Sequence, residues 1–189
     1  MKISILQRGG NKDNHPILES ATRYFAKQLM STRMNNTLSI RIEMRTSKLG
    51  KDALGSCSTA SIGSKSNKEF TIMVQRDSEI NEQLVILAHE MVHVQQKAMN
   101  TLQYRLWKSD KKYHTRWNGK DAGLFDEIPY AERPWEIEAF AQESVLKKAF
   151  VNHFKGNLDR EKQRLSEFKS IQKQLMNKRK EGVSLELSA

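Results

Sequence analysis

The feature that most constrains the fold is a long amphipathic segment in the middle of the chain. Its apolar residues recur at three- and four-residue spacing: Ile80, Leu84, Leu87, Met91 and Val94. This period predicts a helix with one buried face. Ser78 is a favourable N-cap for it, and Glu79 and Glu82 place negative charge in its first turns, where the helix dipole stabilises it.

Shorter patterns surround this segment. Helical spacing predicts a helix over residues 15–30, another from 135 to 154 behind Pro134, and a charged one over 158–180. Apolar alternation predicts strands at 37–45 and 69–74, with a short one at 58–62. Residues 100–133 have no clear period, and we interpret them as a long ordered excursion. The expected fold class is α+β, with a small sheet beside the long helix.

The length and composition of the chain limit its domain organisation and its location. The 189 residues suffice for one domain with an appendage, and we expect a domain over 1–154 and a basic helix and tail over 155–189, packed on that domain. No apolar stretch reaches the roughly 20 residues of a membrane helix, and charge returns at Arg8, too early for a secretory segment. Cys57 is the only cysteine, so no internal disulfide forms. A cytoplasmic location is expected.

The net charge of +10 is concentrated in two places. Residues 105–120 hold six Lys or Arg against one acid, and residues 155–180 hold nine against three. Each region is either a contact for a polyanion or a solvated surface that keeps the protein dissolved. The sequence supports both interpretations equally.

The long helix carries a pattern that points to chemistry, His89-Glu90-Met91-Val92-His93. Residues four apart lie on one helical face, so His89 and His93 can bind one Zn²⁺ through their imidazoles. Glu90 lies about 100° around the helix, so it can hold a water beside the metal without being a ligand. The spacing therefore predicts a zinc site with Glu90 as general base.

A catalytic zinc needs a third protein ligand and an open position. The residues leave three candidates: His114 in the excursion, and Glu136 and Glu138 at the start of the helix behind Pro134. The two glutamates point about 200° apart, so only one can face the metal. Small Ala139 beside Glu138 favours close approach of a second helix, whereas Glu136 suits a dipole partner in a first turn. We expect Glu138 to be the ligand.

The pattern at 89–93, followed by Glu138-Ala139, resembles the gluzincin class of zinc metallopeptidases. Leu87-Ala88 before the first motif, and residues 134–139 as a whole, resemble small phage-encoded metallopeptidases described as SprT-like. The resemblance covers roughly residues 15–150.

The resemblance carries several expectations. It implies a zincin-like fold, in which an N-terminal helix and a small twisted sheet pack on the 89–93 helix, and a glutamate-bearing helix and a charged C-terminal helix follow. It implies Zn²⁺ bound by His89, His93 and Glu138, with Glu90 as base, in the host cytoplasm if the chain is phage-encoded. Thermolysin-like relatives orient a ligand histidine with an aspartate four residues after the glutamate; here that position is Gln142.

The expected activity is hydrolysis of peptide bonds in a protein or peptide substrate. The oxyanion needs a donor besides the metal, and Tyr130, His114, Tyr113 and Arg133 lie between the two motifs. We prefer Tyr130.

The alternative is a basic protein associated with nucleic acid. Its zinc would be structural, or its peptidase activity would be directed at DNA-bound proteins. The basic segments 105–120 and 155–180 motivate this alternative, with weak nucleic-acid contact and no membrane. Against it, the sequence lacks helix-turn-helix or zinc-finger spacing, and its aromatic residues do not interleave with the basic runs.

Overall fold

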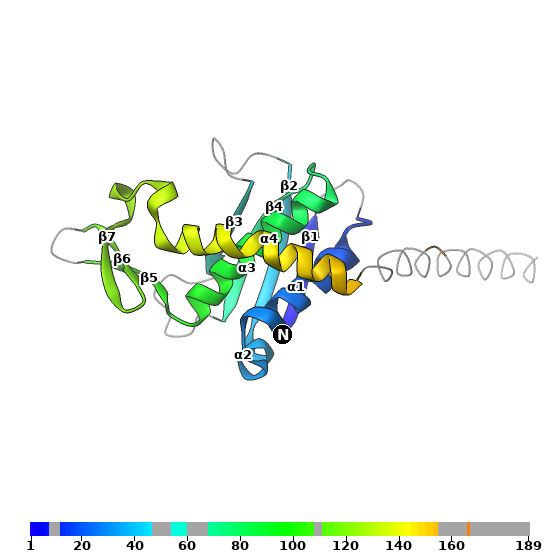
Figure 1. The fold of residues 1–189 in the computed structure, drawn as a ribbon, viewed down its shortest axis with the longest axis horizontal. Helices are drawn as coiled ribbons and strands as arrows, with labels where there is room; N and C mark the ends of the chain where they lie inside the picture. The colour runs from blue at the N-terminus through cyan, green and yellow to red at the C-terminus, as the bar shows by residue number, and fades with distance from the viewer. Residues whose placement is uncertain (8–11, 47–53, 60–67, 108–110, 155–165, 167–189) are drawn as a thin grey trace, which may run out of the picture. The chain divides into compact units, whose positions relative to one another are not determined.

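The computed structural model describes residues 1–7, 12–46, 54–59, 68–107, 111–154 and 166 (Figure 1). The chain divides into the units Met1–Phe150 and Val151–Ala189. The second unit is described only at residues 151–154 and at Ser166, so the charged helix expected over 158–180 lies outside the described residues. No helix among the described residues is long and apolar enough to cross a bilayer.

The first sheet has four strands in the order β1-β2-β4-β3. The strands β1 (Lys2–Gln7), β2 (Ser39–Arg45) and β4 (Glu69–Gln75) are parallel, and β3 (Gly55–Thr59) runs antiparallel to β4 at the edge. The alternation predicted for β2 and β4 is confirmed, since every second side chain of each strand is buried. The expected short strand lies at 55–59 rather than 58–62, and β1 was not predicted.

The helices of the described part of the chain are α1 (His15–Leu29), α2 (Thr32–Thr37), α3 (Ile80–Ala98) and α4 (Pro134–Phe154). The long helix α3 packs against α1, β3 and β4, and it crosses the front of the sheet in Figure 1. It starts two residues after the predicted cap, with Glu79 as the N-cap and no side-chain cap. Instead, the amide of Gln83 donates to the carbonyls of Arg76 and Ser78 and holds the entering turn.

The excursion between α3 and α4 is an antiparallel meander. Its strands are β5 (Leu102–Leu106), β6 (Tyr113–Trp117) and β7 (Lys120–Leu124), and two 3₁₀ turns, η1 (Phe125–Glu127) and η2 (Tyr130–Glu132), lead to α4. Asn118 and Gly119 connect β6 to β7 with φ of 49° and 80°, as a tight hairpin turn with two left-handed residues requires. The α+β class is thus confirmed, while the zincin-like assignment stays a prediction.

Candidate metal centre

Two histidines of α3 and one glutamate of α4 converge on a common point. The Nε2 atoms of His89 and His93 each lie 3.2 Å from the same Oε2 atom of Glu136. All three side chains are buried, and one ligand atom from each lies within 4.8 Å of the others. These three side chains are close enough together to bind a single metal ion.

The carboxylate at this point belongs to Glu136, so the prediction of Glu138 is wrong. Glu136, Phe140 and Glu143 follow one another along the face of α4 that lines the cleft. Glu138 points elsewhere and accepts a hydrogen bond of 2.8 Å from the Gln96 amide. The third candidate, His114, lies on β6 and stacks on Trp107 instead.

The error in helix phase has a physical cause. The apolar side chains of Ile137 and Val145 do not mark the buried side of α4, since they are 53% and 66% exposed. The buried side holds Trp135, Ala139 and Leu146 instead. Because apolar and charged residues are mixed around the whole circumference of α4, its hydrophobic pattern does not determine which side faces α3.

The Nδ1 atoms of both imidazoles, which point away from Glu136, form hydrogen bonds with side-chain oxygen atoms. Nδ1 of His89 lies 2.8 Å from Oε2 of Glu143, and Nδ1 of His93 lies 2.8 Å from Oε1 of Gln96. The Gln96 amide nitrogen donates to the Trp135 carbonyl and to Glu138, so its oxygen must accept from His93. Glu143 and Gln96, and not Gln142, therefore hold the hydrogen on Nδ1 of the two rings.

This arrangement suits a cation. With hydrogen on Nδ1, each imidazole presents its Nε2 lone pair to the carboxylate of Glu136, and the lone pairs repel unless a positive charge lies between them. Burial opposes ionisation of Glu136, but when a proton on Nε2 takes the place of that cation, hydrogen bonds from His89 and His93 hold the pKa of the Glu136 carboxyl far below the ordinary value. Burial likewise opposes charge on His89, but Glu136, Glu90 and Glu143 raise its pKa overall. The donors thus match the imidazole and carboxylate ligands of a divalent metal.

Glu90 lies beside this cluster with one oxygen uncommitted. It is only 5% exposed, and among the described residues its Oε2 atom has no hydrogen-bond partner. Burial raises the pKa of its carboxyl, against the opposing effect of the two histidines. Glu90 therefore offers a lone pair at the site, as a general base requires.

The cluster opens into a cleft of about 650 Å³. Gly55, Ser56 and Cys57 of the edge strand β3 form part of its wall, and Lys97 of α3 donates to the Cys57 carbonyl. Burial raises the pKa of the Cys57 thiol to about 11, so this sulfur stays protonated at neutral pH and is a weak ligand.

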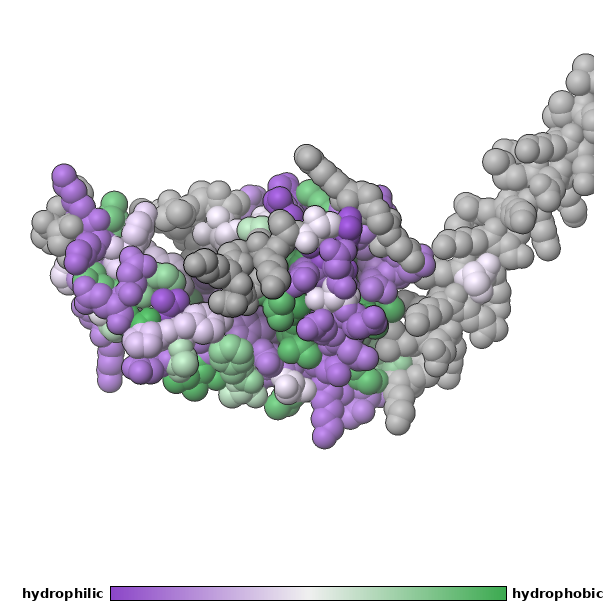
Figure 2. All heavy atoms as spheres, turned by 90° about the horizontal axis from the view of Figure 1, so that it is seen from above, coloured by the Kyte–Doolittle hydropathy of each residue, from purple (hydrophilic) through white to green (hydrophobic). Residues whose placement is uncertain are grey.

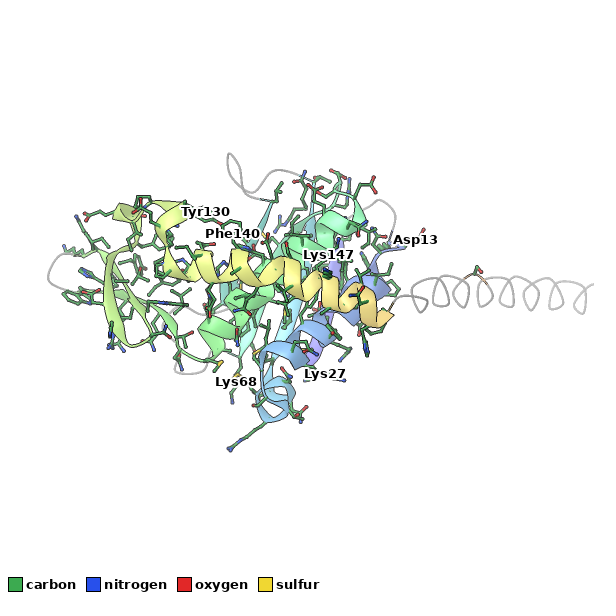
Figure 3. The ribbon with its side chains drawn as sticks, in the orientation of Figure 1. Asp13, Lys27, Lys68, Tyr130, Phe140 and Lys147 are labelled. Atoms are coloured by element: carbon green, nitrogen blue, oxygen red, sulfur yellow. The ribbon has the colours of Figure 1, made fainter. Side chains whose placement is uncertain are left out.

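Two tyrosines reach the cleft from the segment between α3 and α4. Tyr130 lies beside Phe140, with ring centroids 6.1 Å apart (Figure 3). Burial and a hydrogen bond to Glu136 raise its pKa. Tyr104 of β5 also lines the cleft, and we did not predict it. The alternation of Leu102, Tyr104 and Leu106 would have indicated the strand that carries it.

The other two candidate donors have different surroundings. Arg133 lines the cleft, but its guanidinium lies 4.1 Å from the Phe125 ring centroid and donates to the carbonyls of Phe125 and Ile128. Tyr113 is exposed and does not line the cleft. Tyr130 and Tyr104 are therefore the phenols that the fold brings nearest to the cluster.

Comparisons with protein-family models, with curated proteins and with solved structures found no match to this chain.

Proposed function

We propose that this protein is a zinc-dependent metalloendopeptidase of the gluzincin type. The observation that carries the proposal is the convergence of His89, His93 and Glu136 beside the uncommitted carboxylate of Glu90. Two nitrogens and one oxygen on two helices leave a position open toward the cleft, which is the donor set of catalytic rather than structural zinc.

The residues divide the chemistry between them. Bound zinc would supply Lewis acidity toward water and a peptide carbonyl. Glu90 accepts the proton of the attacking water and passes it to the leaving nitrogen. Its buried carboxylate has one oxygen without a hydrogen-bond partner among the described residues, which leaves that oxygen available to the water. Tyr130 is our choice for the donor that stabilises the oxyanion, and Tyr104 is the second candidate.

The edge strand supports a polypeptide as the substrate. Of the described strands, only β4 pairs with β3, and residues 55–57 line the cleft. An extended peptide can add to such an edge through main-chain hydrogen bonds. That binding mode places a peptide bond, rather than a side chain, near the cluster.

The test compares zinc-loaded protein with Glu90→Gln on a library of quenched fluorescent peptides. We expect Glu90→Gln to keep its zinc and lose turnover, because the change removes a base and not a ligand. Glu132→Gln, an exposed carboxylate that is not part of the cleft lining, is the matched control and should hydrolyse normally. Equal rates for Glu90→Gln and the unchanged protein would refute the role of Glu90.

A further inference from the structure

We propose that the meander has a second function, as a binding surface for single-stranded nucleic acid. The surface is the outer face of β5 and β6, formed by Gln103, Arg105, Trp107, His114 and Arg116. None of these residues lines the cleft, so the proposal stands independently of the peptidase.

The strand register places these side chains on one face. Arg105 pairs with His114 and Gln103 with Arg116, and Trp107 continues β5 by donating its backbone N–H to the Lys112 carbonyl. Alternation turns Tyr104 and Trp117 to the opposite face. There they contact Phe125 and Trp135, with centroids 5.3 and 6.3 Å apart. On the outer face Arg105 and Trp107 are exposed, and Gln103, His114 and Arg116 are partly exposed.

An aromatic stack lies on the outer face. The rings of Trp107 and His114 are nearly parallel, with centroids 3.9 Å apart and 9° between their planes. Although the imidazole covers one side of the indole, Trp107 is still 44% exposed. The indole can therefore accept a stacked base, an interaction worth about 1–3 kcal/mol per base in proteins that bind single strands.

Cations surround this stack. Arg105 and Arg116 lie on the same face, and Lys111 and Lys112 at the end of the hairpin. Arg105 donates to Gln103 and Arg116 to the Gly119 carbonyl, but a guanidinium has five donor hydrogens and keeps others for phosphate.

Among the described residues around the stack, two acids oppose this charge without cancelling it. Asp121 lies 3.9 Å from Nδ1 of His114 and also accepts from the Gly123 N–H. Glu127 lies 3.7 Å from Nζ of Lys112. Four cations thus face two acids around the stack. Figure 2 shows hydrophilic and apolar side chains mixed over this end of the molecule.

The combination of ring stacking with cations favours a single strand over other polyanions. The sequence argued against this partner because its aromatic residues do not alternate with its basic runs. Pairing of β5 with β6 removes that objection, since it sets His114 opposite Arg105 and between Arg116 and Lys112 along β6, with Trp107 stacked on its ring. A duplex, heparin or an anionic vesicle could use the cations, but only unstacked bases would use the indole.

The experiment measures binding of the full chain to fluorescein-labelled oligo(dT) of 20 nucleotides by anisotropy at low salt. We expect Trp107→Ala to weaken binding about 5- to 150-fold, the equivalent of one stacked base, and Trp107→Phe to recover most of the loss. Binding of a duplex of equal length and of heparin should change little. Basic residues 155–180 stay intact throughout, so their contribution is constant.

A charge control accompanies this series. Arg105→Glu with Arg116→Glu should weaken oligo(dT) binding far more than Arg33→Glu with Arg41→Glu, which changes the net charge equally at exposed positions elsewhere. Absence of oligo(dT) binding, or unchanged binding by folded Trp107→Ala, overturns the proposal. Binding of anionic vesicles without binding of oligo(dT) also overturns it and assigns the surface to a membrane. Glu90→Gln should bind oligo(dT) normally, which separates this outcome from any failure of the peptidase.

Discussion

Gly55 of the edge strand lies close against α3, which makes Gly55→Ala a sharp test of how Glu90 is positioned. A Cβ atom at residue 55 would lie 2.5 Å from Cγ2 of Ile86 and 2.7 Å from Oε1 of Glu90. Both distances are far inside van der Waals contact, and both neighbours are buried. The added methyl group must therefore displace the Glu90 carboxylate, the Ile86 side chain or the strand.

The two collisions have separate consequences. Overpacking against Ile86 should lower the free energy of unfolding by about 1–3 kcal/mol. Displacement of the Glu90 carboxylate by about 1 Å should lower kcat about 100-fold, with a smaller change in KM. Zinc content should not change, since the three atoms nearest to the new Cβ belong to Ile86 and Glu90 and not to the metal cluster.

Thermal unfolding, zinc analysis and steady-state hydrolysis measure these quantities. Adding Ile86→Leu removes the Cγ2 atom, so the double variant should regain stability and not kcat. Ser58→Ala, an exposed site on the same strand, is the control and should behave as the unchanged protein. A kcat for Gly55→Ala equal to that of the unchanged protein would refute the reasoning.

Three further predictions concern the cluster. Glu136→Ala should lower zinc affinity by orders of magnitude and Glu138→Ala much less, as competition with a chromogenic chelator would measure. Gln96→Ala and Glu143→Ala should each cost about 10- to 100-fold in the same assay; affinities equal to that of the unchanged protein would contradict their orienting role. In metal-free protein the pKa of His89 is raised from 6.5 and that of Glu136 lowered from 4.5. Their pairing therefore stabilises the folded state fully between pH 4.5 and 6.5. This stabilisation is lost as the pH rises through the His89 pKa, and it weakens as the pH falls below 4.5. Thermal melts between pH 5 and 9 should show the loss at high pH, and Glu136→Gln should flatten it.

The elements that the sequence predicted well are those with one-sided patterns. The alternation of β2 and β4 buries a single face of each strand, so period and orientation agree. The apolar stripe of α3 predicted the helix itself, although residues 86–94 are buried on all sides of it. The same spacing placed His89 and His93 on one turn. The third carboxylate was not predictable in this way, because α4 buries Trp135 and Ala139 while it exposes Ile137 and Phe140. Only packing against α3 selects Glu136.

The meander was missed for a different reason. Its strands have five residues each, too short for a period to stand out among charged and aromatic side chains. Asn118-Gly119 was nevertheless a readable signal, since this dipeptide favours the tight turn of a hairpin. Using it would have placed β6 and β7, and with them the face that carries His114 and Trp107.

The meander also separates the ligands along the chain, and this has a consequence for chain entropy. A metal held by His93 and Glu136 would tie two points 43 residues apart. By the loop-closure relation used for disulfides, such a tie removes about 4 kcal/mol of freedom from the unfolded chain. That contribution grows only with the logarithm of the loop length, so residues inserted at the Asn118-Gly119 turn should cost the metal-bound protein little. We therefore expect that the hairpin can lengthen, shorten or be exchanged while His93 of α3 and Glu136 of α4 still converge on one point.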